Sequence, residues 1–281
     1  MPIIEGVLHG GGLLLGPTAE IFVVDPTNGP YTTMQAAIDD AIDNRGDVIL
    51  RMRGNETVTT SIKFNKAGLR VMSIGPDMAP LAQGEFYSVL ADAAYTDGPV
   101  ALFTADRCRV EGMGFVSRDT GSRFFAGAAV LIGGAADAAP FGVHLKHCRF
   151  PKWNVSNRMG IAIEGSSDVL IEECGFEGVG ADFETGIYVQ GATANLTVKR
   201  CVFRDCTYAI THGAFAGGGP DAIYQENTVL AGKMLDSGGN AAVALVAGNW
   251  LQNATNTGSY DATVATLQGQ GIEFSGNHYS E

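Results

Sequence analysis

The chain has 281 residues, of which 46% are hydrophobic and 17% charged, and its formal net charge at pH 7 is −12. A protein that binds nucleic acid needs a basic stripe to neutralise phosphates, and the sequence contains none, so we expect no nucleic-acid partner. The 38 glycines are about twice the ordinary share and follow no collagen-like period. This composition favours a fold with many tight corners.

Residues 1–30 are rich in glycine and are expected to form an N-terminal arm, with residues 21–24 as a strand. The arm either folds back on the chain's own coils or contacts other chains. The apolar run at residues 13–15 is too short for a signal peptide or a membrane span, and no basic segment precedes it. We therefore expect a protein made in the host cytoplasm, not secreted by the classical route and without a membrane partner.

An amphipathic helix is predicted at about residues 32–44, at the start of a β-helix domain that covers residues 31–281. Its apolar residues recur at three and four positions, which is the helical period. They are Met34, Ala37, Ile38, Ala41 and Ile42. We expect this helix to cap the open end of the first coil, before strands at about residues 47–52, 57–64, 69–74, 86–90 and 100–103.

The segment from Asp25 to Ile38, followed by Gly46 to Leu50, resembles the opening segment of the right-handed β-helix proteins in the pectate-lyase-like superfamily. That group includes polysaccharide lyases, polygalacturonases, pectin methylesterases and virion proteins such as phage tailspikes. The resemblance covers most of the chain from Asp25 onward and is greatest to the virion-associated members. It implies a right-handed β-helix and specifies activity poorly, because one fold serves many functions.

Seven similar triplets follow along the chain. They are Val110, Met113 and Phe115; Leu145, Cys148 and Phe150; Ile171, Cys174 and Phe176; Val198, Cys201 and Phe203; Tyr224, Asn227 and Val229; Val246, Asn249 and Leu251; and Phe274, Asn277 and Tyr279. Their middle residues are 35, 26, 27, 26, 22 and 28 positions apart. Such a period is typical of a solenoid and holds two or three short strands. We therefore predict an all-β fold, a parallel β-helix.

The middle residues of the triplets are expected to stack inside the solenoid, because equivalent positions of neighbouring coils lie about 4.8 Å apart. The thiols of Cys148, Cys174 and Cys201 would be followed by an asparagine stack whose amides bond along the axis. An odd number of cysteines, 5 in all, at such positions indicates buried free thiols in a reducing compartment rather than disulfides.

A second repeated segment is a short strand that ends in glycine, at residues 160–165, 186–191 and 209–213. We expect Gly165, Gly191 and Gly213 to lie at corners with positive φ. Loop excursions are predicted at residues 119–140 and 214–220, where a solenoid would carry a binding function. The last coil is expected to be covered by residues 255–270 or by a partner chain.

Catalytic motifs of polysaccharide hydrolases are matched in one place only. Polygalacturonase-like hydrolases have a Gly-His-Gly segment, to which Thr211, His212 and Gly213 are similar, but their Asp-Asp and Arg-Ile-Lys segments have no equivalent here. His212 aligns with Ile163 and Val189 of neighbouring repeats, so we expect it inside the core, bonded to a partner, and not acting as a base.

Calcium-dependent lyase chemistry needs acidic residues beside a basic group. The nearest match is Asp182 with Glu184, with Arg204 and Asp205 on the next coil, and a solvated acidic corner is the preferred interpretation. The histidines at 144, 147 and 278 are scattered, and neither they nor the cysteines have the spacing of metal ligands. We therefore predict no catalytic, cofactor or metal residues and no cofactor.

Aromatic residues could stack on sugar rings or contact another protein. They are Phe124, Phe125, Trp153 and Trp250. The interpretation we favour is a noncatalytic structural or attachment component of a phage virion, a capsid decoration or tail-associated protein. It would form a homo-oligomer, preferably a trimer, and contact other virion proteins. One alternative is a polysaccharide lyase or glycoside hydrolase acting on acidic glycans, and the other is an adhesin for a cell-surface glycan.

Overall fold

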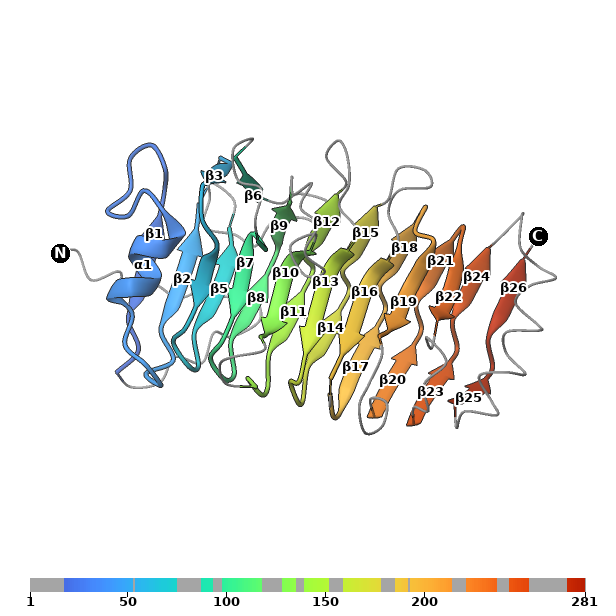
Figure 1. Cartoon of the computed structure of the whole chain (residues 1–281). Helices are drawn as coiled ribbons and strands as arrows, with labels where there is room; N and C mark the ends of the chain where they lie inside the picture. The colour runs from blue at the N-terminus through green and yellow to red at the C-terminus, as the bar shows by residue number, and fades with distance from the viewer. Residues whose placement is uncertain are drawn as a thin grey trace.

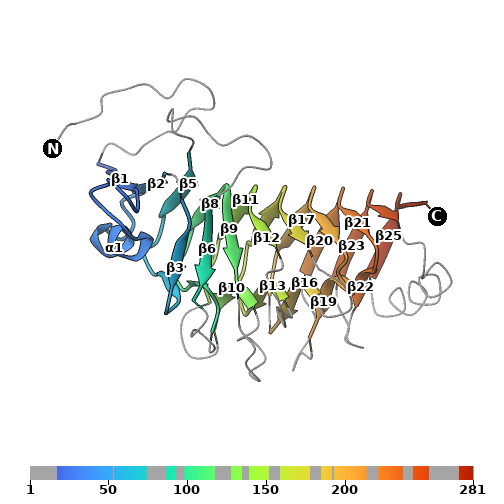
Figure 2. The same cartoon turned by 90° about the horizontal axis from the view of Figure 1, so that it is seen from above.

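The computed structural model describes residues 18–52, 54–74, 87–92, 98–117, 128–134, 139–151, 159–177, 185–191, 193–213, 221–236, 243–252 and 272–280. In these residues the chain winds into a parallel β-helix, as predicted from the period of the triplets. Three sheets run along its length, and successive strands of each sheet come from successive coils. The coils form one elongated column with α1 at its N-terminal end (Figures 1 and 2).

The first sheet contains ten strands. They are β1 (Ile21–Val24), β2 (Val48–Arg51), β5 (Arg70–Ser73), β8 (Arg109–Glu111), β11 (His144–Lys146), β14 (Leu170–Glu172), β17 (Leu196–Lys199), β20 (Asp221–Gln225), β23 (Val243–Ala247) and β25 (Ile272–Ser275). The strand predicted at residues 21–24 forms and pairs with β2, with Ile21 opposite Val48. The boundary between an arm and the β-helix at residue 30 stays a prediction.

The second sheet contains nine strands. They are β3 (Glu56–Val58), β6 (Tyr87–Ala91), β9 (Met113–Val116), β12 (Arg149–Pro151), β15 (Gly175–Glu177), β18 (Val202–Arg204), β21 (Thr228–Leu230), β24 (Trp250–Gln252) and β26 (His278–Ser280). The third sheet contains seven. They are β4 (Ile62–Phe64), β7 (Ala101–Phe103), β10 (Ala128–Gly133), β13 (Met159–Glu164), β16 (Thr185–Gln190), β19 (Tyr208–His212) and β22 (Lys233–Asp236). The single strand predicted at residues 57–64 is two strands, β3 and β4, in different sheets.

The triplets align in register, which confirms the repeat. Val198 lies opposite Ile171 in the preceding coil and Tyr224 in the following one. Phe203 lies likewise between Phe176 and Val229. The first residue of each triplet therefore belongs to the first sheet and the last residue to the second. The middle residue lies at the corner between them in six triplets, and in the first triplet Met113 already begins β9.

A stack of phenylalanine rings fills the interior beside the second sheet. The rings of Phe150 and Phe176 lie 4.7 Å apart between centroids at an interplanar angle of 7°, and those of Phe176 and Phe203 lie 4.7 Å apart at 6°. Phe115 extends the stack with a centroid distance of 6.0 Å to Phe150. All of these side chains are buried, so the stack joins the coils through dispersion and burial of apolar surface.

Glycines on the third sheet make room for this stack. A Cβ added at Gly186 would lie 2.6 Å from Cδ1 of Phe203, and one at Gly160 would lie 2.7 Å from Cδ1 of Phe176. We expect Gly186→Ala to lower the free energy of unfolding by about 1–3 kcal/mol, because the Phe203 ring must shift in a packed core. Urea unfolding followed by circular dichroism measures the loss.

Gly134, directly after β10, serves as a matched control. Among the described residues no heavy atom lies within 4 Å of a Cβ added at Gly134, and its φ is not positive, so Gly134→Ala should leave the unfolding midpoint unchanged. Equal losses for the two variants would contradict the packing role of Gly186.

The interior corner ladder has the predicted order of thiols and then amides. Sγ of Cys201 lies 3.6 Å from the carbonyl oxygen of Ile171 in the preceding coil. In the next coil, Nδ2 of Asn227 donates to the carbonyl oxygen of Val198 at 3.0 Å. Thiol and amide therefore reach the same backbone position one coil back. Nδ2 of Asn249 also donates to Oδ1 of Asn277 at 2.9 Å, an amide-to-amide bond of the kind predicted.

The cysteines are buried and free, as predicted. Burial raises the pKa of the Cys148 and Cys174 thiols well above the usual value, and raises the pKa of Cys108 to about 12. Since the thiolate is the nucleophile, these thiols remain unreactive at neutral pH. Their role is therefore packing and weak hydrogen bonding inside the ladder.

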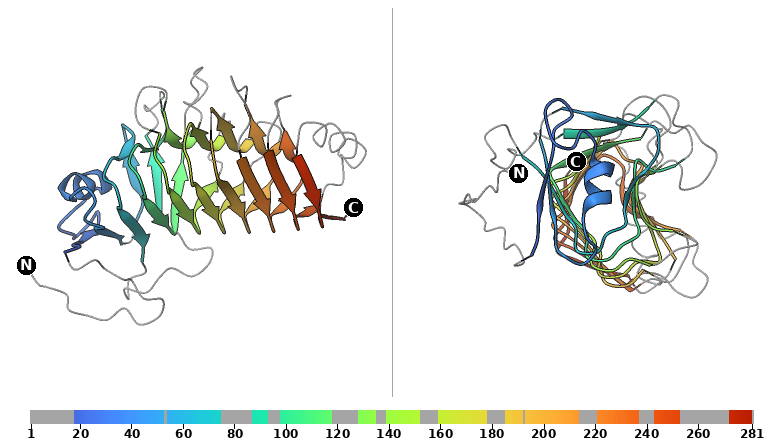
Figure 3. Two further views of the ribbon diagram at one scale, coloured as in Figure 1. Left: turned by 90° about the horizontal axis from the view of Figure 1, so that it is seen from below. Right: turned by 90° about the vertical axis from the view of Figure 1, so that its left-hand side faces the viewer.

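Helix α1 (Met34–Asp40) forms within the predicted range and lies across the N-terminal end of the coils, as Figure 3 shows. Oγ1 of Thr33, the N-cap, accepts a hydrogen bond from the backbone N–H of Ala36 at 3.3 Å. Met34, Ala37 and Ile38 are buried against the core. The prediction for Ile42 was wrong: it is 54% exposed, because Ala41 is already extended, with ψ 146°, and the helix has ended.

Asp47 fixes the end of this cap. Its buried carboxylate accepts hydrogen bonds from the backbone N–H groups of Glu20 at 2.9 Å and Ile42 at 2.8 Å, and from Nε of Arg45 at 2.6 Å. Burial by itself would raise the pKa of Asp47, but these hydrogen bonds hold it below its usual value. The carboxylate therefore joins the start of β1, the end of α1 and the start of β2.

Two of the three glycine corners are as predicted. Gly165 has φ 64° and Gly191 has φ 76°. Gly213 does not have positive φ, so that prediction was wrong; a Cβ there would lie 1.9 Å from Oη of Tyr188, and the close approach of the tyrosine explains the glycine. The loop excursion predicted at residues 119–140 was wrong for residues 128–133, which form the buried strand β10 between β7 and β13 because the apolar side chains of Val130 and Ile132 fill the core. The rest of that excursion at residues 119–127 and 135–138, the excursion at residues 214–220 and the cover at residues 255–270 lie outside the described residues.

Candidate functional site on the outer face of the first sheet

A row of alternating charges runs along the outer face of the first sheet. Lys146 on β11 lies opposite Glu111 on β8 and Glu172 on β14, and Glu172 lies opposite Lys199 on β17. Residues with equivalent positions in a parallel sheet point to the same side, about 4.8 Å apart. Each charge in the row therefore has an opposite charge on the neighbouring coil.

A second row lies beside it, at the corner that leads to the second sheet. Its residues directly precede the Cys or Asn of the triplets: His147, Glu173, Arg200 and Glu226. All have left-handed backbone, with φ of 52°, 55°, 54° and 56°. Such a conformation is uncommon for residues other than glycine and costs about 1–2 kcal/mol each. Here the backbone N–H of each residue continues the bonding between coils; that of Glu173, for example, donates to the carbonyl oxygen of Lys199 at 3.1 Å.

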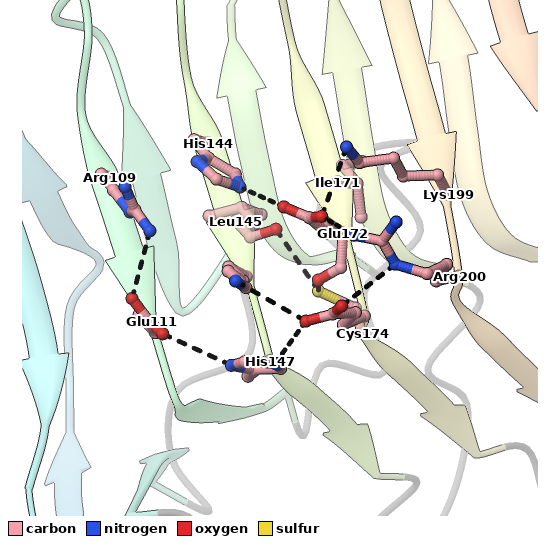
Figure 4. A network of polar contacts seen from close by, with 12 residues as sticks. Arg109, Glu111, His144, Leu145, His147, Ile171, Glu172, Cys174, Lys199 and Arg200 are labelled. Atoms are coloured by element: carbon pink, nitrogen blue, oxygen red, sulfur yellow. Dashed lines mark hydrogen bonds and ion pairs between the residues drawn. The ribbon is translucent and has the colours of Figure 1, made fainter. Parts of the chain in front are cut away.

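Glu172 is the centre of the network (Figure 4). Its carboxylate lies 3.3 Å from Nζ of Lys199 and 3.3 Å from Nε2 of His144, and forms an ion pair with the guanidinium of Arg200. The residue is only 7% exposed. Burial alone would raise the pKa of Glu172, but the hydrogen bond from Lys199 and the charges of Lys199, Lys146 and Arg200 hold it below 4.5.

Glu173 connects the two rows. Nε of Arg200 lies 3.0 Å from one of its carboxylate oxygens, Nζ of Lys146 lies 3.7 Å from the other, and the His147 imidazole contacts it directly. Nδ1 of His147 in turn lies 3.4 Å from Glu111. The pKa of Glu173 is lowered, because these cations outweigh its partial burial. The contacts therefore form one continuous chain across neighbouring coils (Figure 4).

The histidines were predicted to be scattered, and for His144 and His147 this was wrong. Both belong to the network, because one ends up on β11 and the other at the corner that follows it. Burial, followed by the charge of Arg109, lowers the pKa of His144, so its imidazole is neutral at pH 7. The sequence signal that reveals the site is an ionisable residue before four successive triplet residues, Cys148, Cys174, Cys201 and Asn227; before Asn249 and Asn277 the residue is glycine.

Loss of the central carboxylate is expected to weaken the column. We expect Glu172→Gln to lower the free energy of unfolding at pH 7 by about 1–2 kcal/mol, because an amide cannot match the cations around it. Since the pKa of Glu172 is lowered in the folded state, its contribution is present above its usual value of 4.5 and is lost as pH falls through the folded value. The wild type should therefore lose stability on acidification over this window, and the variant should lose less.

Thermal unfolding of both proteins between about pH 3 and pH 7 tests this prediction. Glu226→Gln, at the exposed end of the network and 3.9 Å from Arg200, is the matched control and should change the midpoint little. Identical pH profiles for the wild type and Glu172→Gln would contradict the assigned role.

The network is an electrostatic clamp and not a reactive centre. It contains as many carboxylates as permanent cations: Glu111, Glu172, Glu173 and Glu226 against Arg109, Lys146, Lys199 and Arg200. Each carboxylate faces a cation, and the pKa values of the two central ones, Glu172 and Glu173, are lowered rather than raised as a general base would need. Among the residues that the structure describes, no group of His, Cys, Asp and Glu is arranged to hold a metal ion.

The outer face of the third sheet is different in character. Leu131, Ala162 and Tyr188 point outward in β10, β13 and β16 and are nevertheless buried. This part of the sheet therefore offers no open groove. At the C-terminal ends of β13 and β16, Glu164 lies opposite Gln190, and both are half-buried. Oε1 of Gln190 is buried and has no hydrogen-bond partner within the described part of the chain.

The other candidate residues named from the sequence do not belong to the charged network. His212 is buried opposite Val189, and its Nε2 lies 2.6 Å from the hydroxyl of Tyr224, which confirms a core histidine with a partner. Burial lowers the pKa of His212 to about 4. Arg204 is exposed at the end of β18, and Asp205 occupies the following corner. Asp182, Glu184, Phe124, Phe125 and Trp153 lie outside the described residues.

Comparisons with known proteins agree with this architecture. The family model described as "Right handed beta helix region" matches residues 128–281. No curated protein matches the sequence. In the part of the chain that the structure covers, no helix is long and apolar enough to cross a membrane.

Solved structures show the same fold at low sequence identity. Pectin methylesterase from carrot has a TM-score of 0.56 at 11% identity, covering 96% of this chain and 85% of that one. Pectin methylesterase from Aspergillus niger has 0.54 at 12%, covering 94% and 86%. Alginate lyase from Paenibacillus sp. str. FPU-7 has 0.50 at 13%, covering 92% and 95%. Likeness at this level of identity concerns the fold alone.

Proposed function

The chain belongs to the right-handed β-helix family, and on this premise we propose that it is a noncatalytic structural or attachment component of a phage virion. The observation that carries the proposal is the use of the outer charges of the first sheet. They are paired from coil to coil, with Glu172 and Glu173 each facing several cations. Charges committed to such pairs stiffen a column and leave the carboxylates unsuited to acid-base catalysis.

The interior supports the same function. Phe150, Phe176 and Phe203 stack with parallel rings, and the amide of Asn227 bonds to the preceding coil. A solenoid depends on the contacts between neighbouring repeats, so ladders at the core, at the corner and on the surface all strengthen the same contacts. A stiff column of this kind suits a component that is exposed on a particle, either as a capsid decoration or as part of a tail.

The partners proposed here are copies of the chain itself, preferably as a trimer, together with other virion proteins. Light scattering after size-exclusion chromatography measures the oligomer. Phage particles whose genome encodes the chain should contain this protein after purification on a density gradient. Mass spectrometry and antibody labelling in electron microscopy detect the protein in the particles. Absence from purified particles would reject the virion role.

A polysaccharide-acting enzyme is the second candidate, and one observation favours it. Glu164 and Gln190 lie side by side at the C-terminal ends of β13 and β16 in the third sheet, and Oε1 of Gln190 has no hydrogen-bond partner among the described residues. Tyr188 lies two residues before Gln190 on the same strand. A carboxylate beside an amide and a phenol could bind or act on a sugar. The test is incubation of the chain with pectin and with alginate. If methanol or unsaturated sugars are released by the wild type and not by Glu164→Gln, the enzyme proposal holds and the structural one fails. If both polymers are unchanged after prolonged incubation, the structural proposal is supported.

A further inference from the structure

An outward-facing row on the second sheet contains Trp250, the most exposed of the described Phe, Tyr and Trp side chains. Val202, Thr228, Trp250 and His278 are successive register partners on β18, β21, β24 and β26. Trp250 is 49% exposed, and Val202 is exposed as well. The rings of Trp250 and His278 lie 6.2 Å apart between centroids at an angle of 30°. The indole is therefore supported on one side by the imidazole of the neighbouring coil and open on its outer surface.

The surroundings of Trp250 differ from the charged rows on the first sheet. Its outward neighbours on the second sheet are the uncharged residues Thr228 and Gln252. The row of Val202, Thr228, Trp250 and His278 contains no Lys, Arg, Asp or Glu, so it offers an anionic ligand no permanent cation to pair with and suits an uncharged one.

We propose that the row around Trp250 binds a neutral saccharide. The apolar face of a pyranose ring would stack on the exposed indole, which presents a large rigid surface at low entropy cost. The hydroxyl of Thr228 and the amide of Gln252 supply donors and acceptors for sugar hydroxyls. The inference rests on the attachment role proposed above and names the ligand class for it. It lies on the second sheet, away from Glu164 and Gln190 on the third.

Tryptophan fluorescence provides a direct test, because the chain contains only 2 tryptophans, at positions 153 and 250. In a Trp153→Phe variant the signal comes from Trp250 alone. The probes are oligosaccharides of neutral glucose, mannose and galactose, with oligogalacturonate as the acidic comparison. At least one neutral probe should change the emission of Trp250 saturably, while oligogalacturonate should not.

Isothermal titration calorimetry of single variants of the full chain then shows whether Trp250 is the residue that binds the neutral probe. Trp250→Ala should weaken binding of that neutral probe by at least about tenfold, which corresponds to the contribution of one aromatic contact. The side chain points outward, so the melting midpoint of the variant should stay near that of the wild type. Ile223→Ala, which removes an exposed apolar side chain from the first sheet, is the matched control and should leave the affinity unchanged.

Four results would overturn the proposal. The first two are no fluorescence response to any neutral probe and a response to oligogalacturonate alone. The third is an affinity of Trp250→Ala for the neutral probe equal to that of the wild type. The fourth is self-association of the wild type that Trp250→Ala abolishes, which would make the row a contact with a second copy. The two proposals fail separately. Neutral-sugar binding at Trp250 in a chain absent from particles rejects the virion role only, and particle incorporation without sugar binding rejects the saccharide site only.

Discussion

Replacing Phe176 by alanine is expected to lower the free energy of unfolding by about 3–5 kcal/mol, because it removes the centre of the ring stack. Phe176 lies between Phe150 and Phe203 at centroid distances of 4.7 Å on both sides. It is fully buried, and its neighbours are held by the strand registers above and below, so the cavity can close only partly. The loss combines the transfer of the ring to water with the contacts that both neighbours forfeit.

Urea unfolding followed by circular dichroism measures this loss. Phe176→Leu keeps most of the apolar volume and should lose less than Phe176→Ala, whereas Val202→Ala, on the exposed side of the adjacent strand β18, should lose little. The unfolding of a solenoid can depart from a two-state transition, in which case the comparison uses the midpoints of the last transition. A shift in Phe176→Ala no larger than that in Val202→Ala would show that the stack does not hold the column together.

The fold could be predicted because its signal repeats. Val198, Cys201 and Phe203 occupy positions whose spacing recurs seven times in related form. The period of two places Cys201 and Phe203 on the same face of the chain, and all three side chains are buried in the core. Burial demands this pattern in every coil, since each coil presents its apolar face to the next. The same logic placed His212 correctly in the core, through its alignment with Val189.

The charged network could not be predicted in the same way. Its members vary in type from coil to coil, because a surface position tolerates many residues as long as the signs alternate. His147 and Glu173 also lie in left-handed backbone, where a sequence-based argument expects glycine. The hydrogen bonds of their backbone N–H groups to the next coil make that conformation acceptable, and such bonds are visible only once the register is known.

The glycines show the opposite difficulty. Gly165 was identified as a corner from its place after a strand, and its φ of 64° agrees. Gly186 and Gly213 have other reasons, the Phe203 ring and the Tyr188 hydroxyl respectively, which belong to residues far away in sequence or on another coil. A single residue type thus serves backbone conformation in one place and packing in another, and the sequence alone does not distinguish the two.

Replacing Asn227 by alanine should also have a large effect, a loss of about 2–4 kcal/mol in the free energy of unfolding. Asn227 is fully buried where the thiol ladder meets the amide ladder. Its Oδ1 accepts from the backbone N–H of Cys201 at 2.9 Å, and its Nδ2 donates to the carbonyl oxygen of Val198 at 3.0 Å. Alanine removes both bonds at once and leaves the Cys201 N–H without this partner inside the core.

Two further variants separate shape from hydrogen bonding at this position. Asn227→Cys introduces the residue that the preceding coil has at this position. Its thiol can contact a backbone carbonyl as Sγ of Cys201 contacts that of Ile171 at 3.6 Å. The loss in the free energy of unfolding should therefore be less than half of that for Asn227→Ala. Asn227→Asp keeps the shape but turns an acceptor toward the Val198 carbonyl. Burial would raise the pKa of the new carboxyl in the folded state, so this variant should gain stability relative to the wild type as pH falls, because the protonated acid can donate. If Asn227→Asp were as stable as the wild type at pH 7 while Asn227→Ala was destabilised, the ladder would contribute through packing alone.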